Sequence, residues 1–122
     1  MPLVVVIEDD AGSRKTLGRV LGAGGFDAAL YESAEAFLEA PPDRPPIGML
    51  LDLQLGGMSG LDLLRSLTGH DAHFPTIIIT AFESRQYREE ARRLGCVAYL
   101  KKPCEAKTIL AALRNLTGGI PD

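Results

Sequence analysis

Residues 47–52 read IGMLLD, a run of apolar residues that ends on a single carboxylate, Asp52. An unbroken apolar run of this length, without alternating polar residues, is typical of a strand buried on both faces of a sheet. The pair Gly56-Gly57 then interrupts the chain before the next apolar stretch. We therefore expect Asp52 at the carboxyl end of a buried strand, followed by a loop.

The same alternation of a short apolar run with an amphipathic stretch occurs five times along the chain. The expected strands span 3–7, 28–31, 47–51, 76–80 and 97–100. The expected helices span 13–21, 34–39, 61–67, 84–94 and 105–116. Strands that alternate with helices in this way predict βαβ units with right-handed crossovers, and hence an α/β fold whose parallel sheet is covered on both faces.

Serine, glycine and proline mark the ends of these elements. Ser33 and Ser59 are suited to cap the amino ends of the second and third helices. The glycine-rich segment 22–25 is expected to end the first helix, and Gly95 the fourth, since a left-handed residue commonly closes a helix. The segment 41–46 (PPDRPP) cannot continue a helix and is expected to form a surface connection.

Length and composition are those of one ordinary globular domain. The chain has 122 residues, of which 46% are apolar and 24% charged, and a formal net charge of −3. This mild acidity argues against direct nucleic-acid binding, which normally requires a clustered basic face. Cys96 and Cys104 lack metal-ligand spacing, no signal peptide is evident, and the apolar run 3–7 is too short to span a bilayer. We expect a single cytoplasmic domain over 1–122, with a core over about 3–116, a tail over 117–122, reduced cysteines and no membrane attachment.

Polar residues gather at the ends of four of the expected strands. They follow or end the first, third, fourth and fifth strands, in the order residues 8–10 (EDD), Asp52, Thr80 and residues 101–103 (KKP). Because ligands of parallel sheets bind beyond the carboxyl ends of the strands, these residues are expected to share one site. Carboxylates this close stay ionised together only if a cation lies among them, and oxygen ligands of this kind suit Mg²⁺.

This set of residues fits phosphoryl transfer to a carboxylate. A carboxylate beside a divalent ion can attack phosphorus and form an acyl phosphate, and Asp52 has the position for that role. Asp9, with Glu8 behind it, is expected to hold the metal, while Lys102 and Thr80 bind phosphoryl oxygens. Each residue alone has a simpler explanation, as a helix cap, a turn residue or surface charge. Their joint arrival at four strand ends favours one shared site.

Five segments of the chain together resemble the receiver domains of two-component response regulators. They are residues 5–10 (VVIEDD), 50–53 (LLDL), 57–60 (GMSG), 75–81 (PTIIITA) and 94–103 (LGCVAYLKKP). The likeness runs from about residue 3 to residue 116 and looks closest to regulators of the nitrogen-fixation type. It implies a single-domain, flavodoxin-like fold of five βα units, with a parallel sheet in the order 2-1-3-4-5.

The resemblance also implies a cofactor and its ligands. Asp52 would be the phosphoacceptor, and Mg²⁺ the cofactor. Asp9 would bind the ion directly together with Asp52, Glu8 would hold it through water, and the backbone carbonyl of Gln54 would complete the protein ligands.

The remaining implied roles concern the phosphoryl group and the response to it. Thr80 and Lys102 would bind the phosphoryl group, and Pro103 would follow Lys102 through a cis peptide bond. Tyr99 matches the aromatic switch position, whose side chain turns inward as Thr80 moves toward the phosphate. The output would be a change in the face made by the fourth helix, fifth strand and fifth helix. Candidate contact residues on this face are Tyr87, Arg88, Arg92, Arg93, Lys107 and Arg114, although a charged helix is often merely solvated.

The sequence departs from the family pattern in three places and leaves two variable positions beside the site. Glu8 stands where Asp is more usual, Gly56 where Pro is common, and Cys104 where an aromatic residue is frequent; none of these removes a required chemical group. Gln54 and Phe82 occupy the positions that flank the hydrolytic water in this family. A bulky Phe82 is expected to obstruct that water and prolong the phosphorylated state, unless it only packs against the neighbouring helix.

The resemblance implies partners but does not name them. A sensor histidine kinase or a phosphotransfer protein would supply the phosphoryl group, and an effector domain or protein would read the output. A phosphorylation-dependent homodimer, and whether the domain stands alone or belongs to a longer regulator, are left open. The chain would promote only its own phosphorylation and dephosphorylation, and so is not expected to be an enzyme in the ordinary sense. The alternatives are a degenerate receiver that binds partners without phosphorylation, and an unrelated enzyme or flavin protein, which the absence of nucleotide-binding glycine motifs disfavours.

Overall fold

The computed structural model describes residues 1–67, 74–82 and 84–116, and its elements alternate strictly between strand and helix. The strands are β1 (Leu3–Ile7), β2 (Asp27–Tyr31), β3 (Gly48–Leu51), β4 (Thr76–Thr80) and β5 (Cys96–Lys101). The helices are α1 (Ala11–Ala23), α2 (Ala34–Glu39), α3 (Gly60–Leu67), α4 (Arg85–Arg93) and α5 (Ala106–Leu116). All ten expected elements are present, with small differences at their ends. The expected tail over 117–122 lies outside the described residues.

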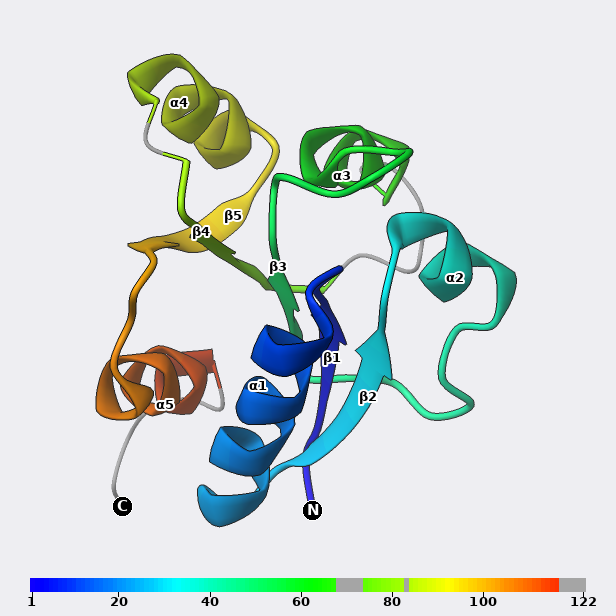
Figure 1. The fold of residues 1–122 in the computed structure, drawn as a ribbon, viewed down its shortest axis with the longest axis vertical. Coiled ribbons are helices and arrows are strands. Elements are labelled where there is room, and N and C mark those ends of the chain that lie inside the picture. The colour runs from blue at the N-terminus through cyan, green and yellow to red at the C-terminus, as the bar shows by residue number, and fades with distance from the viewer. Residues whose placement is uncertain (68–73, 83, 117–122) are drawn as a thin grey trace.

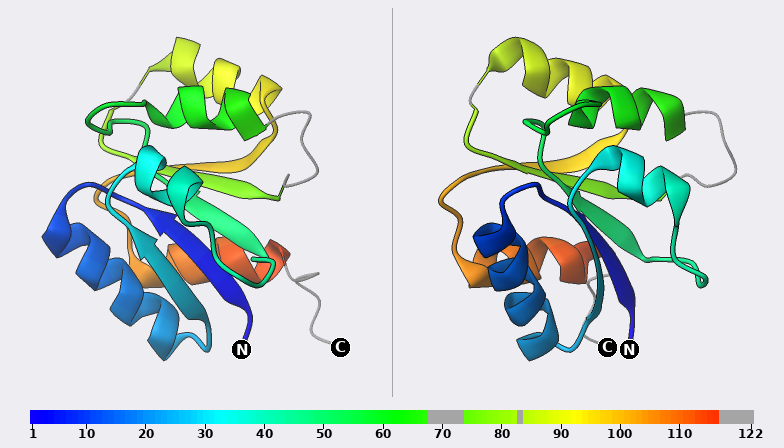
Figure 2. Two further views of the ribbon diagram at one scale, coloured as in Figure 1. Left: turned by 90° about the vertical axis from the view of Figure 1, so that its right-hand side faces the viewer. Right: turned by 45° about the vertical axis from the view of Figure 1, so that its right-hand side comes forward.

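The five strands form one parallel sheet in the order β2-β1-β3-β4-β5, which confirms the predicted topology. In the register, Val6 of β1 lies between Leu30 of β2 and Leu50 of β3. Helices α1 and α5 cover one face of the sheet, while α2, α3 and α4 cover the other (Figures 1 and 2). Strand β2 lies on one side of β1, whereas β3, β4 and β5 are added on the other side, so the order of the strands switches between β1 and β3. Because these two strands are parallel, their carboxyl ends lie at the same edge of the sheet.

Each face of the sheet carries its own hydrophobic core, because successive side chains of a strand point in opposite directions. Val5 and Ile7 pack with Phe37 and Leu63 on the side of α2, α3 and α4. Val4 and Val6, the alternate residues of β1, belong to the other core, which also contains Leu21 of α1 and Leu113 of α5. All five residues of β1 are buried, as are those of β3 and β4, which explains why these strands read as unbroken apolar runs.

The helix ends follow from local hydrogen bonds. The Ser33 hydroxyl accepts from the Ala36 amide and the Ser59 hydroxyl from the Asp62 amide, so both predicted caps are confirmed. Helix α1 is longer than the predicted 13–21 at both ends, because Asp10 caps it by accepting from the Ser13 amide and the helix continues through Gly22. Gly95 has a φ of 99°, the left-handed conformation expected after α4.

None of the helices within the described ranges is both long and apolar enough to cross a lipid bilayer.

Replacing a fully buried core residue tests this packing. Leu63→Ala should lower the free energy of unfolding by about 2–4 kcal/mol, because the side chain has no exposed surface and its truncation leaves a cavity. Leu38→Ala is the matched control, since Leu38 is 42% exposed, and it should cost less than about 1 kcal/mol. Urea unfolding measures both, and equal losses in the two variants would contradict the assignment of Leu63 to the core.

Candidate functional site

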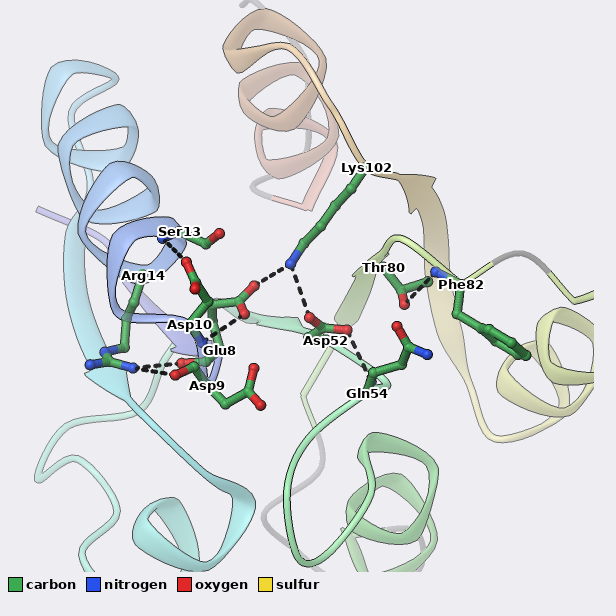
Figure 3. Close-up of polar contacts among 10 residues, drawn as sticks. All are labelled: Glu8, Asp9, Asp10, Ser13, Arg14, Asp52, Gln54, Thr80, Phe82 and Lys102. Carbon is green, nitrogen blue, oxygen red and sulfur yellow. Dashed lines mark hydrogen bonds and ion pairs between the residues drawn. The ribbon is translucent and has the colours of Figure 1, made fainter.

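The predicted site residues meet at the carboxyl edge of the sheet (Figure 3). Glu8 directly follows β1 and Asp52 directly follows β3, and the backbone amide of Asp52 donates to the carbonyl of Ile7 at 3.1 Å. On the neighbouring strands, the amide of Lys102 donates to the carbonyl of Thr80 at 2.9 Å. These backbone bonds hold the four strand ends in register, so their side chains face one another.

The centre of the site is an ion-paired group of three side chains. The Lys102 Nζ lies 2.5 Å from Glu8 Oε1 and 3.0 Å from Asp52 Oδ2. The side chains of Glu8 and Asp52 are only 3% and 8% exposed, whereas that of Lys102 is 25% exposed. One ammonium therefore joins two nearly buried carboxylates that come from different strands.

Burial shifts the pKa of both kinds of group in this cluster. Burial raises the pKa of Glu8 above its ordinary value, although hydrogen bonds from Lys102 and from the Asp10 amide act in the other direction. Burial alone would lower the pKa of Lys102, but its hydrogen bonds and ion pairs with Glu8 and Asp52 outweigh this effect and raise it. Because the pKa of Glu8 is raised by folding, protonated Glu8 favours the folded state. This contribution to the free energy of unfolding is lost as the pH rises through the pKa of Glu8 in the folded state.

Asp9 adds a third carboxylate to the site. Glu8, Asp9 and Asp52 each offer one oxygen, and these three atoms lie within 4.8 Å of one another. Asp9 is exposed, and Figure 3 shows its carboxylate on the open side of the cluster, away from Lys102. Three carboxylates and one ammonium leave two negative charges if all are ionised. The described residues thus form an acidic cluster whose charge matches that of a divalent cation.

Gln54 and Thr80 also lie at this edge, and each takes part in a hydrogen bond between a backbone amide and a side chain. The Gln54 amide donates to Asp52 Oδ1 at 3.0 Å, so each oxygen of Asp52 accepts one hydrogen bond. Thr80 has no exposed surface, and its hydroxyl oxygen accepts from the amide of Phe82 at 3.2 Å. This leaves the Thr80 hydroxyl proton available to donate to another acceptor.

Tyr99 and Phe82 lie beyond Thr80, toward α4. The Tyr99 hydroxyl donates to the carbonyl of Phe82 at 3.2 Å, and the Arg88 guanidinium lies 4.9 Å from the centre of the Tyr99 ring. The Phe82 ring is 5.1 Å from the ring of Tyr87 in α4 and points away from Asp52 in Figure 3. Phe82 therefore does pack on the neighbouring helix. Its effect on the lifetime of the phosphorylated state stays a prediction, as does the movement of Tyr99. Lys102 and Pro103 are joined by the expected cis peptide bond.

The structure adds two residues beside the site that the sequence patterns did not single out, Arg14 and Glu35, and it gives Asp10, already expected there, the role of a helix cap. Asp10 caps α1, and Arg14 of that helix donates from Nη1 to the carbonyls of Glu8 and Asp9 at 2.9 and 3.3 Å. Glu35 of α2 accepts from the amide of Met58, 23 residues further along the chain, at 2.7 Å. The position of Asp10, three residues before Ser13 at a helix start, was a readable capping signal. The contact of Glu35 leaves no pattern in the sequence.

Comparison with known proteins agrees with this arrangement. The family model of the response regulator receiver domain matches residues 4–114. The chain therefore belongs to the response regulator receiver domain family of two-component signalling. Its resemblance to this family, inferred above from five segments, is confirmed, and phosphorelay signalling is the setting in which the family works.

Individual relatives share both sequence and fold with the chain. The transcriptional regulatory protein FixJ of Azorhizobium caulinodans is 37% identical over 117 residues, which cover 94% of this chain and 54% of that protein. FixJ of Bradyrhizobium diazoefficiens is 32% identical over 112 residues, covering 92% of this chain and 55% of that protein. The chain thus spans about half the length of these curated relatives. A solved response regulator receiver protein from Burkholderia phymatum superposes with a TM-score of 0.83 at 34% identity, covering 97% of this chain and 96% of that one.

Removing the central ammonium tests the electrostatics of the cluster. At about pH 7, Lys102→Met should lower the free energy of unfolding by about 1–3 kcal/mol, less than for a fully buried pair because Lys102 is partly exposed. The deficit should be smaller at a mildly acidic pH, because Glu8, whose pKa is raised, takes up a proton more readily there and then no longer needs the ammonium. Urea unfolding at the two pH values measures this, with Lys107→Met on the exposed face of α5 as the control. A deficit that grows on acidification would contradict the ion-pair account.

Proposed function

We propose that this domain is a Mg²⁺-dependent switch that accepts a phosphoryl group on Asp52. The observation that carries the proposal is the position of Asp52, whose two oxygens are held by Lys102 and by the Gln54 amide beside the carboxylates of Glu8 and Asp9. Membership of the receiver family supports the same conclusion, since receivers act as phosphoacceptor switches in two-component signalling. A role as an enzyme on separate substrates is not part of the proposal.

The residues present fit a magnesium ion. Oxygen ligands are what Mg²⁺ prefers, and the two excess negative charges of the cluster match its charge. Two direct ligands of one Mg²⁺ ion lie at most about 4.2 Å apart, somewhat less than the 4.8 Å within which the three oxygens fall. Following the family pattern, Asp9 and Asp52 would bind the ion directly, together with the Gln54 carbonyl, and Glu8 would bind it through water. When bound, the ion supplies charge neutralisation for the phosphoryl oxygens.

The chemical step needs little beyond positioning and charge. An oxygen of Asp52 attacks the phosphorus of a phosphohistidine on a sensor kinase or phosphotransfer protein. The P–N bond breaks, the electron pair stays on the histidine nitrogen, and the P–O bond of an acyl phosphate forms. Lys102 then exchanges its contact with Asp52 for phosphoryl oxygens, and Thr80 donates its free hydroxyl proton to the same group.

A hydrogen-bonded link offers a physical route from the site to the output face. The amide of Phe82 donates to Thr80, and the carbonyl of Phe82 accepts from Tyr99, so one peptide segment joins the two side chains. A movement of Thr80 toward the phosphoryl group pulls on this segment and changes the environment of Tyr99. The Tyr99 ring in turn contacts Arg88 of α4. Phosphorylation thereby shifts the population of conformations of the face formed by α4, β5 and α5.

The proposed partners follow from this switch. A histidine kinase or phosphotransfer protein supplies the phosphoryl group, and an effector domain or protein, or a second copy of the domain, reads the α4–β5–α5 face. The name of the FixJ relatives, transcriptional regulatory proteins, favours an effector that acts on transcription in a longer chain. Direct nucleic-acid binding by this domain is not proposed, because its net charge is −3.

Phosphorylation with a small-molecule donor tests the proposed function directly. Incubation with acetyl phosphate and Mg²⁺ should add a single phosphoryl group, detected by intact-protein mass spectrometry, because Asp52 and Lys102 provide the nucleophile and the charge. Asp52→Asn and removal of Mg²⁺ with a chelator should each abolish the adduct. Asp62→Asn is the matched control, since Asp62 lies on the surface of α3 and pairs with Arg65. If the wild-type chain folds but takes up no phosphoryl group, the chain is instead a receiver that acts without phosphorylation.

The lifetime of the phosphorylated state tests the role of Phe82. Gln54 and Phe82 line one recess of about 400 Å³ beside the site, so a water molecule has room to approach and Phe82 occupies part of that space. We expect Phe82→Ala to speed dephosphorylation by roughly threefold or more, since more water then reaches the acyl phosphate. Phe82→Leu keeps most of the bulk and should stay close to wild type. An unchanged or slower rate in Phe82→Ala would refute the blocking role and leave only the packing of Phe82 on α4.

A further inference from the structure

The loop that follows the phosphoacceptor has little rigidity of its own. Between Asp52 and α3 it contains Gly56, whose surroundings are open, and Gly57, which adopts a left-handed φ of 77°. Adjacent glycines give a loop many conformations in the absence of other restraints. The base of the loop is closed where the amide of Gly60 donates to the carbonyl of Leu53 at 3.2 Å. Its tip must therefore be held by something outside the loop.

Glu35 at the start of α2 makes that contact. Its Oε2 accepts from the Met58 amide at 2.7 Å, and the same atom would lie 2.6 Å from a Cβ at position 57. The carboxylate thus sits directly against the loop backbone, where only glycine leaves room for it. The hydrogen bond from Met58 lowers the pKa of Glu35, so the carboxylate stays ionised and continues to accept at neutral pH.

The held loop carries a group that touches the phosphoacceptor. The amide of Gln54, in the same loop, donates to Asp52 Oδ1 at 3.0 Å and fixes the rotation of that carboxylate. In the proposed metal site, the Gln54 carbonyl is a ligand as well. Any freedom at the loop tip is therefore transmitted, through a few backbone bonds, to both groups that Gln54 presents.

We propose that Glu35 is a positioning residue: by accepting from the Met58 amide it fixes the loop 54–58, and so sets the orientation of Asp52 and the affinity of the site for Mg²⁺. This inference rests on the proposed function and adds to it a residue from an element that contributes no group to the site. Glu35 touches neither the reacting oxygen nor the metal ligands. It acts only through the loop backbone.

An ordinary structural role of Glu35 makes a different prediction from this one. An acidic residue in the first turn of a helix stabilises that helix through its charge, whatever the length of its side chain. Positioning of the loop depends instead on the reach of the side chain to Met58. Two conservative variants separate the two roles: Glu35→Asp keeps the charge but is one methylene shorter, and Glu35→Gln loses the charge but keeps an acceptor oxygen at the same reach.

The experiment compares these variants with wild type and with Glu39→Gln, which removes the same charge from the other end of α2. Glu39 is exposed, and its side chain makes no hydrogen bond or ion pair with any part of the chain that the structure describes. Three quantities are measured: amide hydrogen exchange at Met58 without metal, the Mg²⁺ Kd by calorimetry, and the phosphorylation rate with acetyl phosphate at low and at saturating Mg²⁺. Urea unfolding confirms that each variant is folded.

We expect Glu35→Asp to lose protection at Met58 and to bind Mg²⁺ about fivefold more weakly, the effect of losing one modest hydrogen bond. Its phosphorylation should be slow at low Mg²⁺ and recover in large part at saturation. Glu35→Gln and Glu39→Gln should stay within about twofold of wild type. Equal Mg²⁺ affinity in Glu35→Asp and wild type, or a defect confined to Glu35→Gln, would overturn the inference. A wild-type chain that binds no Mg²⁺ would instead contradict the proposed function.

Discussion

The contact between the Lys102 ammonium and two nearly buried carboxylates, Glu8 and Asp52, is the interaction on which the site depends. It joins the end of β5 to the ends of β1 and β3, which are not consecutive in the chain, and it exists only because the sheet order brings these strand ends to one edge. Neither carboxylate is stable there as an isolated charge. The apolar strands that build the sheet therefore also bury two carboxylates at its edge, and Lys102 compensates part of their charge.

Lys102 compensates only part of the negative charge of the site, and the proposed chemistry depends on the charge that remains. With Asp9, the cluster keeps two negative charges beyond those that Lys102 neutralises. In the proposed function, a divalent cation and a phosphoryl group would both enter without further burial of uncompensated charge, since each would exchange partners with groups already in place. The link from Asp52 to Gln54, and the link from Thr80 through Phe82 to Tyr99, are hydrogen bonds between a side chain and the backbone. In the proposed switch, these links would pass a change of partners at the centre on to the loops.

Much of this arrangement was predictable from the sequence. The rest was not predictable, and there is a physical reason for this. Buried strands produce apolar runs and their ends carry the polar residues, so the fold and the joint placement of Glu8, Asp9, Asp52, Thr80 and Lys102 could be inferred from local patterns. Tertiary contacts made by single surface residues leave no such pattern, because nothing near Glu35 or Arg14 in sequence indicates the backbone groups they bind. The direction of the Phe82 ring is likewise decided by its neighbour Tyr87 in α4.

A titration with Mg²⁺, followed by ¹H–¹⁵N NMR in the absence of any phosphodonor, tests the central claim most directly. If carboxylates from β1 and β3 form one site with Lys102, the amides of Asp9, Asp52, Gln54 and Lys102 should shift together along a single saturable curve, with one Kd. Surface carboxylates such as Asp62 should not respond. Shifts that are spread over the surface, that do not saturate, or that leave Asp52 and Lys102 unchanged would contradict the account.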